Sequence, residues 1–141
     1  MFQAFLIAVM LSIARADFTG DWLMKSATFG GTQIEVPSGE VSLSMSLVPD
    51  GYKVFFHAGN RMMGGMIVDD EISDTKAGVH FTPIPSTRMM PPPEFVAVER
   101  FITQAIPEMT TATLNDTGNL VLEGPNGSAE FYPSDGEKGE E

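Results

Sequence analysis

Apolar and polar residues alternate along several short segments of the chain. The clearest segment is 41–47, Val-Ser-Leu-Ser-Met-Ser-Leu, in which four apolar side chains face one side and three serines face the other. A period of two is typical of a β-strand with one buried face and one face in water. The same pattern predicts a first strand over 21–29, with Trp22, Met24, Ser26 and Thr28 on one side, ended by Gly30-Gly31.

Turn residues separate the other amphipathic segments. Pro49-Asp50-Gly51 predicts a hairpin between 41–47 and the next strand, because proline presets φ and glycine accepts a positive φ. The remaining predicted strands are 52–58, 61–68, 79–81, 109–114, 119–123 and 128–132. A polar loop is expected over 69–78, and hairpin turns are expected at 115–118 and 124–127.

One segment shows helical rather than strand periodicity. It follows an extended, proline-rich stretch and carries apolar residues at helical spacing over 94–106. Pro93 suits the first turn, Pro107 is expected to end the helix, and Glu94 and Glu99 are expected at exposed positions. The order of strands, one helix and more strands predicts an α+β fold, with an antiparallel sheet of about eight strands and the helix packed across it.

The first 16 residues follow neither pattern. Residues 4–14 are apolar except for Ser12, a run of 11 that is too short for a transmembrane helix of about 20 residues. Ala14-Arg15-Ala16 then suits signal peptidase, although no Lys or Arg precedes the run. We expect a cleaved leader over 1–16, one domain over 17–133 and a disordered acidic tail over 134–141. The product is then secreted or in the secretory pathway, without stable membrane insertion; an N-terminal anchor or a buried first strand is the alternative.

The net charge of the chain limits the kinds of molecule that it is expected to bind. The chain has 8 Lys and Arg against 19 Asp and Glu, and every acidic residue lies after Ala16. Loss of Arg15 with the leader would leave 7 against 19, a net charge of −12. Such a field repels phosphate backbones, so nucleic-acid binding is not expected. The chain has no cysteine, so its stability must come from its core.

Methionines and cations gather in two segments, 60–66 and 87–93. The methionines could form an adaptable patch for a peptide or apolar ligand, or they could fill an irregular core. Met62 and Met63 must face opposite sides of a strand, and Arg61 and Arg88 could contact an anion or pair with an internal acid. The candidate ligand-binding residues are Asn60, Arg61, Met62, Met63, Thr87, Arg88, Met89 and Met90.

Catalytic and metal-binding patterns are weak. His57 and His80 are the only histidines and lack the further ligands that a zinc site needs. No nucleophile-elbow motif occurs, and the acidic residues of 69–74 lack the spacing of an EF-hand. We therefore expect no catalytic residue, no metal and no cofactor. Asn115 and Asn126 begin glycosylation sequons on predicted turns, which matter only in a eukaryotic source.

Three groups of residues together resemble the META domain over roughly 18–132. They are Gly20-Asp21-Trp22; Gly59-Asn60-Arg61 with Gly64-Gly65; and Phe81 with Ser86-Thr87-Arg88-Met89-Met90, then Glu99 and Asn119-Leu120-Val121-Leu122. The run 87–94 is more similar to trypanosomatid-type members than to bacterial ones.

The resemblance implies a strongly bent, barrel-like antiparallel sheet closed by the helix, and no established enzymatic activity. Members occur in bacterial envelopes and in parasite proteins linked to virulence. Bacterial members often carry cysteines where this chain has Gly59 and Pro91, so no redox or disulfide role carries over.

Four functional hypotheses follow. The first is a secreted, non-enzymatic binding module for an unknown protein or small apolar ligand, associated with virulence or stress. The alternative is a lipocalin-like carrier, since Gly20-Asp21-Trp22 also matches the opening of that family; such a carrier needs a hollow interior. A hydrolase using His57 or His80 and a purely structural envelope role are the other two.

Overall fold

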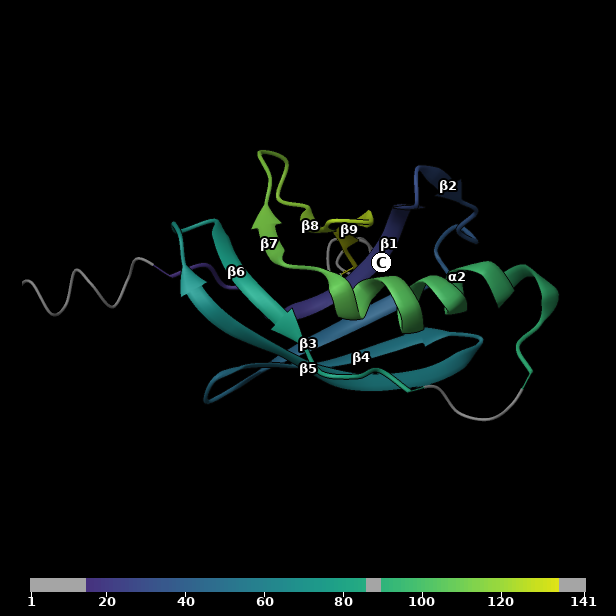
Figure 1. The fold of residues 1–141 in the computed structure, drawn as a ribbon, viewed down its shortest axis with the longest axis horizontal. Coiled ribbons are helices and arrows are strands. Elements are labelled where there is room, and N and C mark those ends of the chain that lie inside the picture. The colour runs from purple at the N-terminus through teal and green to yellow at the C-terminus, as the bar shows by residue number, and fades with distance from the viewer. Residues whose placement is uncertain (1–14, 86–89, 135–141) are drawn as a thin grey trace, which may run out of the picture.

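The computed structural model describes residues 15–85 and 90–134 and consists mainly of one antiparallel sheet (Figure 1). The strands are β1 (Gly20–Phe29), β2 (Thr32–Ile34), β3 (Ser42–Val48), β4 (Gly51–Ala58), β5 (Asn60–Glu71), β6 (Lys76–Phe81), β7 (Thr111–Leu114), β8 (Leu120–Gly124) and β9 (Gly127–Pro133). Their order is β2-β1-β3-β4-β5-β6-β7-β8-β9, and β1 also pairs with β9. The pairing closes a barrel of eight strands, while β2 lies outside as a short addition to β1. The predicted α+β, barrel-like fold is confirmed.

Between β6 and β7 the chain is helical from Pro93 to Glu108. It begins as the 3-10 turn η1 (Pro93–Phe95) and continues as α2 (Val96–Arg100), the π-helical turn η2 (Phe101–Ala105) and the 3-10 turn η3 (Ile106–Glu108). The α- and π-helical part ends at Ala105, before Pro107 as expected, and Pro107 itself lies inside the 3-10 turn that follows. The wide π turn comes just before a proline, whose ring cannot fit against the carbonyl four residues back in a regular α-helix.

The helical segment crosses the opening between two layers of the barrel. β3, β4 and β5 form one layer and β7, β8, β9 and β1 form the other (Figure 1). Buried side chains from both layers and from the helix belong to one core. The largest fully buried side chains include Phe18, Phe56, Phe101, Phe131, Met24, Leu43, Met62, Met66, Ile102 and Met109. The Phe29 and Phe101 rings meet edge to face with centroids 6.3 Å apart, which joins the helix directly to β1.

Two local features of β1 differ from the simple alternating pattern. The pairing of β1 with β9 shifts register between Met24 and Ser26. A bulge of this kind moves the following residues to the other face, so Met24 and Ala27 are both buried, each 2% exposed. Gly30 and Gly31 have φ of 60° and 82° and turn the chain back into β2. Three residues are too few to show a period of two, so the pattern did not predict β2.

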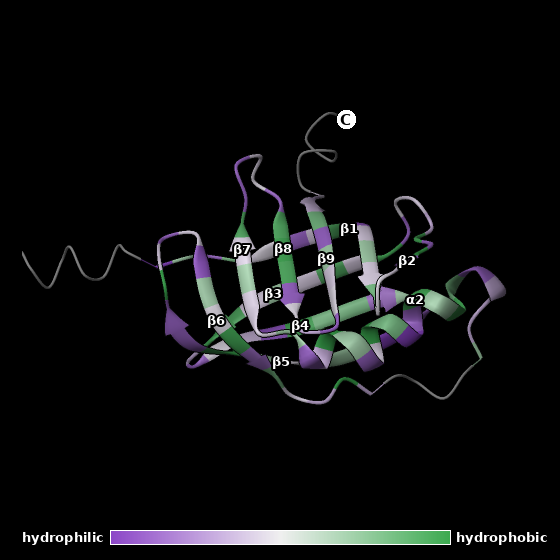
Figure 2. Cartoon of the chain, turned by 45° about the horizontal axis from the view of Figure 1, so that its top comes forward, coloured by the Kyte–Doolittle hydropathy of each residue, from purple (hydrophilic) through white to green (hydrophobic). Residues whose placement is uncertain are grey.

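The hairpin between β5 and β6 is longer than expected. The predicted polar loop over 69–78 is wrong at both ends, since Asp70 pairs with Gly78 and Glu71 with Ala77. Backbone ladder bonds do not require apolar side chains, and both strands end in hydrophilic residues at this tip (Figure 2). Ser134 donates its N–H to the carbonyl of Asp21, while the rest of the expected tail and most of the expected leader lie outside the described residues.

Candidate functional site

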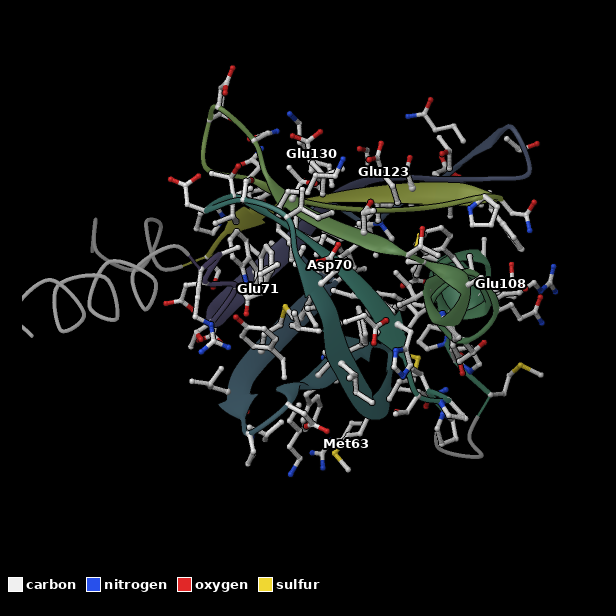
Figure 3. All side chains as sticks on the ribbon, turned by 60° about the vertical axis from the view of Figure 1, so that its left-hand side comes forward. Met63, Asp70, Glu71, Glu108, Glu123 and Glu130 are labelled. Atoms are coloured by element: carbon white, nitrogen blue, oxygen red, sulfur yellow. The ribbon has the colours of Figure 1, made fainter. Side chains whose placement is uncertain are left out.

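The outward positions of β3, β4 and β5 form three rows across the sheet. The strand registers define the rows as Ser42, His57 and Arg61; Ser44, Phe55 and Met63; and Ser46, Lys53 and Gly65. Phe55 is 36% exposed and Met63 is 50% exposed, so the middle row brings two large apolar side chains side by side in solvent. We call these three rows the Phe55–Met63 face. Met63 points away from the barrel in Figure 3.

Two cations flank the apolar pair. Lys53 and Arg61 are exposed in the two outer rows, and neither makes a hydrogen bond or ion pair within residues 15–85 and 90–134. Asp21 of β1 continues the middle row, where its carboxylate accepts a 2.8 Å hydrogen bond from the Ser44 hydroxyl. Lys53 and Arg61 make the three rows themselves cationic, with the Asp21 carboxylate beyond their β3 edge, in a chain whose net charge is −11.

The inner side of the same strands belongs to the core. Met62 and Met66 are 0% exposed, whereas their neighbour Met63 is exposed. Met62 and Met66 therefore pack in the core, which was one of the two alternatives for the methionines. Met62 and Met63 face opposite sides of β5, as predicted. Arg61 and Met63 are the candidates from β5 that a partner can reach.

Asn60 ties β5 to the helix. It is 5% exposed, and its Nδ2 donates a 3.2 Å hydrogen bond to Oε1 of Glu99. Gly59, at φ 80°, lets the chain turn here, and a Cβ on it would come within 3.2 Å of Phe95 and Pro92. Glu99 is half-buried rather than exposed as expected, because it faces this turn. Asn60 therefore supports the shape of the hairpin from inside.

The second candidate segment is only partly described. Thr87, Arg88 and Met89 lie outside the described residues, and Met90 is 85% exposed. On one side of this stretch, Thr82 exchanges hydrogen bonds with Gly65, from Gly65 N to Thr82 Oγ1 at 2.8 Å and from Thr82 N to the Gly65 carbonyl at 2.9 Å. On the other side, Pro92 lies against Gly59. The flanks of the second segment thus lie at both ends of the 59–65 stretch.

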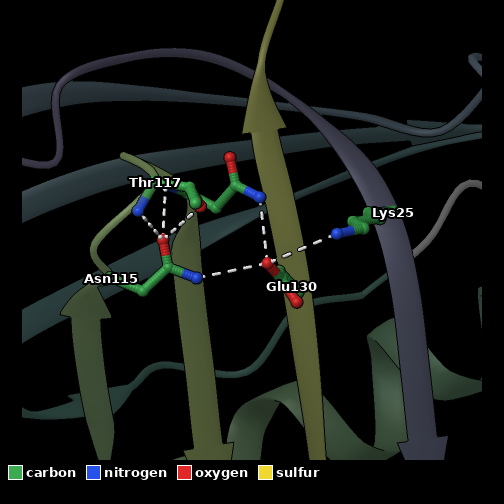
Figure 4. Close-up of polar contacts among 5 residues, drawn as sticks. Lys25, Asn115, Thr117 and Glu130 are labelled. Carbon is green, nitrogen blue, oxygen red and sulfur yellow. Dashed lines mark hydrogen bonds and ion pairs between the residues drawn. The ribbon is translucent and has the colours of Figure 1, made fainter.

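A polar cluster occupies the outer side of β9 (Figure 4). Oε2 of Glu130 accepts hydrogen bonds from Asn119 Nδ2 at 2.9 Å and Asn115 Nδ2 at 3.2 Å, and lies 3.8 Å from Lys25 Nζ. The Asn119 hydrogen bond, with smaller contributions from Asn115 and Lys25, lowers the pKa of the Glu130 carboxyl against the opposing effect of burial. The charges and amides of this cluster satisfy one another.

The two sequons differ in their surroundings. Asn115 is half-buried, and its Oδ1 accepts hydrogen bonds from the backbone N–H and hydroxyl of Thr117 while its Nδ2 is held by Glu130. Asn126 is exposed and donates one 3.1 Å hydrogen bond to Glu108. In the folded chain Asn126 is the more accessible of the two.

Among the described residues, neither histidine lies within hydrogen-bond distance of a hydroxyl group. Nδ1 of His80 lies 2.8 Å from Asp69, and the two side chains are 56% and 50% exposed. The described residues supply His80 with no hydroxyl partner, and His57 projects from the Phe55–Met63 face. Within the described residues no three His, Asp or Glu side chains gather into a possible metal site.

The interior of the barrel is filled by side chains. Phe18, Phe56 and Phe131 are each 0% exposed and meet the helix residues Phe101 and Ile102 in one cluster. The helix also enters between β6 and β7 rather than after all the strands. The structure gives no support to the lipocalin-like carrier.

Phe55 and Lys53 were not among the candidates from the sequence. The segment 52–58 alternates, so Lys53, Phe55 and His57 share the side opposite Val54 and Phe56. An aromatic residue on the polar side of such a strand was the available signal. Its neighbour across the sheet, Met63, becomes known only from the register.

Comparisons with known proteins agree with this fold. A family model for the META domain matches residues 16–135. A solved structure, described as the NMR structure of a protein from Burkholderia xenovorans, aligns with a TM-score of 0.58 and 18% sequence identity, covering 90% of this chain and 87% of that one. At that identity the likeness concerns the fold alone. A search of curated proteins found no significant match.

No helix among the described residues has the length and apolarity to cross a membrane. Since the family match spans most of its length, the chain belongs to the META domain family.

Proposed function

We propose that this protein is an exported, non-enzymatic META-domain module that binds a protein or an apolar ligand through the Phe55–Met63 face. One observation carries the proposal: Phe55 and Met63 lie side by side in solvent, between Lys53 and Arg61, which have no partner among the described residues. Exposed apolar side chains scattered singly need no explanation, but Phe, Met and Arg side chains gathered on one face are of the kinds enriched at protein interfaces.

The size of the face suggests a modest affinity. Full burial of a Phe or Met side chain contributes about 1.5 to 3 kcal/mol, and both are already partly covered here. Association must also offset the lost freedom of two molecules. A partner that contacts only this face would therefore bind weakly and reversibly, unless contacts outside the face add to it.

Export rests on the apolar run at 4–14 and the Ala14-Arg15-Ala16 site. N-terminal sequencing of the protein recovered from culture medium tests it, with Asp17 expected as the first residue. Retention of Met1 would contradict cleavage. The non-enzymatic assignment rests on the family resemblance and on the absence of a catalytic motif in the sequence. The association with virulence or stress rests on the family resemblance alone.

Site-specific crosslinking tests the binding face directly. The chain has no cysteine, so Met63→Cys introduces one unique thiol for a photoreactive label. Ile72→Cys is the matched control, because Ile72 is 51% exposed against 50% for Met63 but lies outside the three rows. We expect Met63→Cys to crosslink a partner from the extracellular fraction, and the Phe55→Thr variant to lose that product. Equal crosslinking from Ile72→Cys would show that the face is not the site.

A further inference from the structure

We infer that the Phe55–Met63 face recognises an extended peptide segment with the pattern acidic–x–apolar–x–acidic. The apolar side chain packs on Phe55 and Met63, and the two carboxylates pair with Lys53 and Arg61. The inference rests on the proposed function and names the chemistry of its partner.

The spacing of the rows sets the pattern. Lys53 and Phe55 are two residues apart on β4, and Arg61 and Met63 are two residues apart on β5, so each cation lies about 7 Å along the strands from the apolar row. An extended peptide places residues i−2, i and i+2 on one side at the same interval. Residue i then meets the apolar pair while i−2 and i+2 reach the outer rows. Both outer rows carry a cation, so the peptide can run in either direction.

Charge favours an acidic partner over a second copy of the chain. Two copies meeting through this face would bring Lys53 and Arg61 of one copy against those of the other, and like charges repel. The net charge of −11 repels an acidic peptide at long range, but screening limits that field to about 8 Å at physiological salt. At contact the unpaired cations of the face dominate.

Shape favours a peptide over a small apolar molecule. Small ligands bind in concave pockets that enclose most of their surface. The structure has surface depressions beside Tyr52 and Leu47, beside Lys25 and Gln33, and beside Phe81 and Pro107, and none of these three includes Phe55 or Met63. The outer side of a sheet instead offers length and a fixed spacing of side chains, which an extended segment can match.

Two peptides of identical composition test the spacing. In acetylated and amidated TETLTET the glutamates lie on the leucine side when the peptide is extended, whereas in TTELETT they lie on the opposite side. The readout is the methyl resonance of Met63, assigned with the Met63→Leu variant and followed as each peptide is titrated to obtain its Kd. We expect TETLTET to bind about fivefold more tightly than TTELETT, from two rim ion pairs, and the preference to shrink as salt is added.

Charge reversal supplies the matched control. Lys53→Glu with Arg61→Glu is expected to abolish the preference for TETLTET and to create one for TKTLTKT over TTKLKTT. Both positions are exposed, so the unfolding midpoint should stay near that of the parent and show that the variant folds.

The outcomes separate this inference from the proposed function. If both glutamate peptides shift the Met63 methyl equally, the spacing rule is overturned while the face remains a binding site. If laurate shifts Met63 and the peptides do not, the face binds a small amphiphile and the peptide inference is overturned. If neither the peptides nor the crosslinked partner perturb Met63, the proposed function falls with it.

Discussion

Met62 and Met63 are neighbours in β5, yet Met62 is fully buried and Met63 is half exposed. The same contrast holds on β4, where Phe56 is buried and Phe55 reaches solvent. The inner residues share the core with the helix, and the outer residues share a surface with Lys53 and Arg61. If the proposed function holds, stability and recognition occupy alternate positions of one hairpin, so we expect that each can be changed without the other.

A second contrast lies between two outer sides of the barrel. Figure 3 shows Glu123 and Glu130 on the side opposite Met63. Around Glu130 the polar groups hold one another, with hydrogen bonds from Asn115 and Asn119. Around Met63 the cations have no such partners among the described residues. A satisfied polar surface stabilises the fold, whereas an unsatisfied one leaves its charges available to a partner.

The largest expected effect is the loss of an inner side chain. Met62→Ala should lower the free energy of unfolding by about 2 to 5 kcal/mol, because it leaves a cavity between the sheet and the helix. Met63→Ala is the matched control and should change the free energy by less than about 0.5 kcal/mol. Urea unfolding of both variants measures the difference. Equal destabilisation would contradict the separation of the two sides.

The next effect concerns the hairpin turn. Asn60→Ala should cost about 1 to 3 kcal/mol, because it removes a buried amide that donates to Glu99. Arg61→Ala, the next residue on the outer side, should be near neutral. Urea unfolding is again the measurement, and a larger loss from Arg61 than from Asn60 would reverse the assignment of inside and outside at this turn.

A smaller effect depends on pH. The pKa of Glu130 is lowered from its ordinary value of 4.5 in the folded chain, chiefly by the Asn119 hydrogen bond. Its stabilisation is therefore complete above the unfolded value and is lost as the pH falls through the lowered folded value. At pH 7 we expect Glu130→Gln to be less stable than the parent by less than about 1 kcal/mol, since the cluster is partly exposed.

The difference between Glu130→Gln and the parent should disappear once the pH is well below 4.5. Urea midpoints at a series of pH values check this. A gap that persists in acid would mean that the amide disturbs packing rather than charge.

The smallest effect on stability is expected on the Phe55–Met63 face. Phe55→Thr with Met63→Thr keeps good strand formers at exposed positions and should change the free energy of unfolding by about 1 kcal/mol or less. Binding of the crosslinked partner should nevertheless be lost. A variant that loses stability and binding together would show that the face also supports the fold.

Most of the fold was accessible from the sequence because its signals are local. The alternation at 41–47 and the helical spacing after Pro93 each report which side of an element is buried. The predictions of strand bounds and strand faces were wrong where the local sequence pattern carries no information about pairing between strands. The bulge in β1 reversed the alternation, β2 was too short for a pattern, and the ladder of β5 and β6 continued through polar residues.

The candidate site was only partly accessible. Arg61 and Met63 were named from their residue types, but Met62 was named with them although it is buried. Phe55 and Lys53 were missed because nothing in 52–58 shows which residues of β5 lie beside them. Residue type alone does not separate a core methionine from one on the surface.

The sequence by itself determined the strand-rich class, the single helical segment and the cysteine-free core, because short-range periodicity and composition carry that information. The family resemblance rests instead on short motifs such as Gly20-Asp21-Trp22. Only the tertiary structure decided that the barrel closes through β1 and β9 and that Phe55 lies opposite Met63. Register and closure depend on contacts between residues far apart in the chain. A shift of one residue would turn every side chain of a strand to the other face.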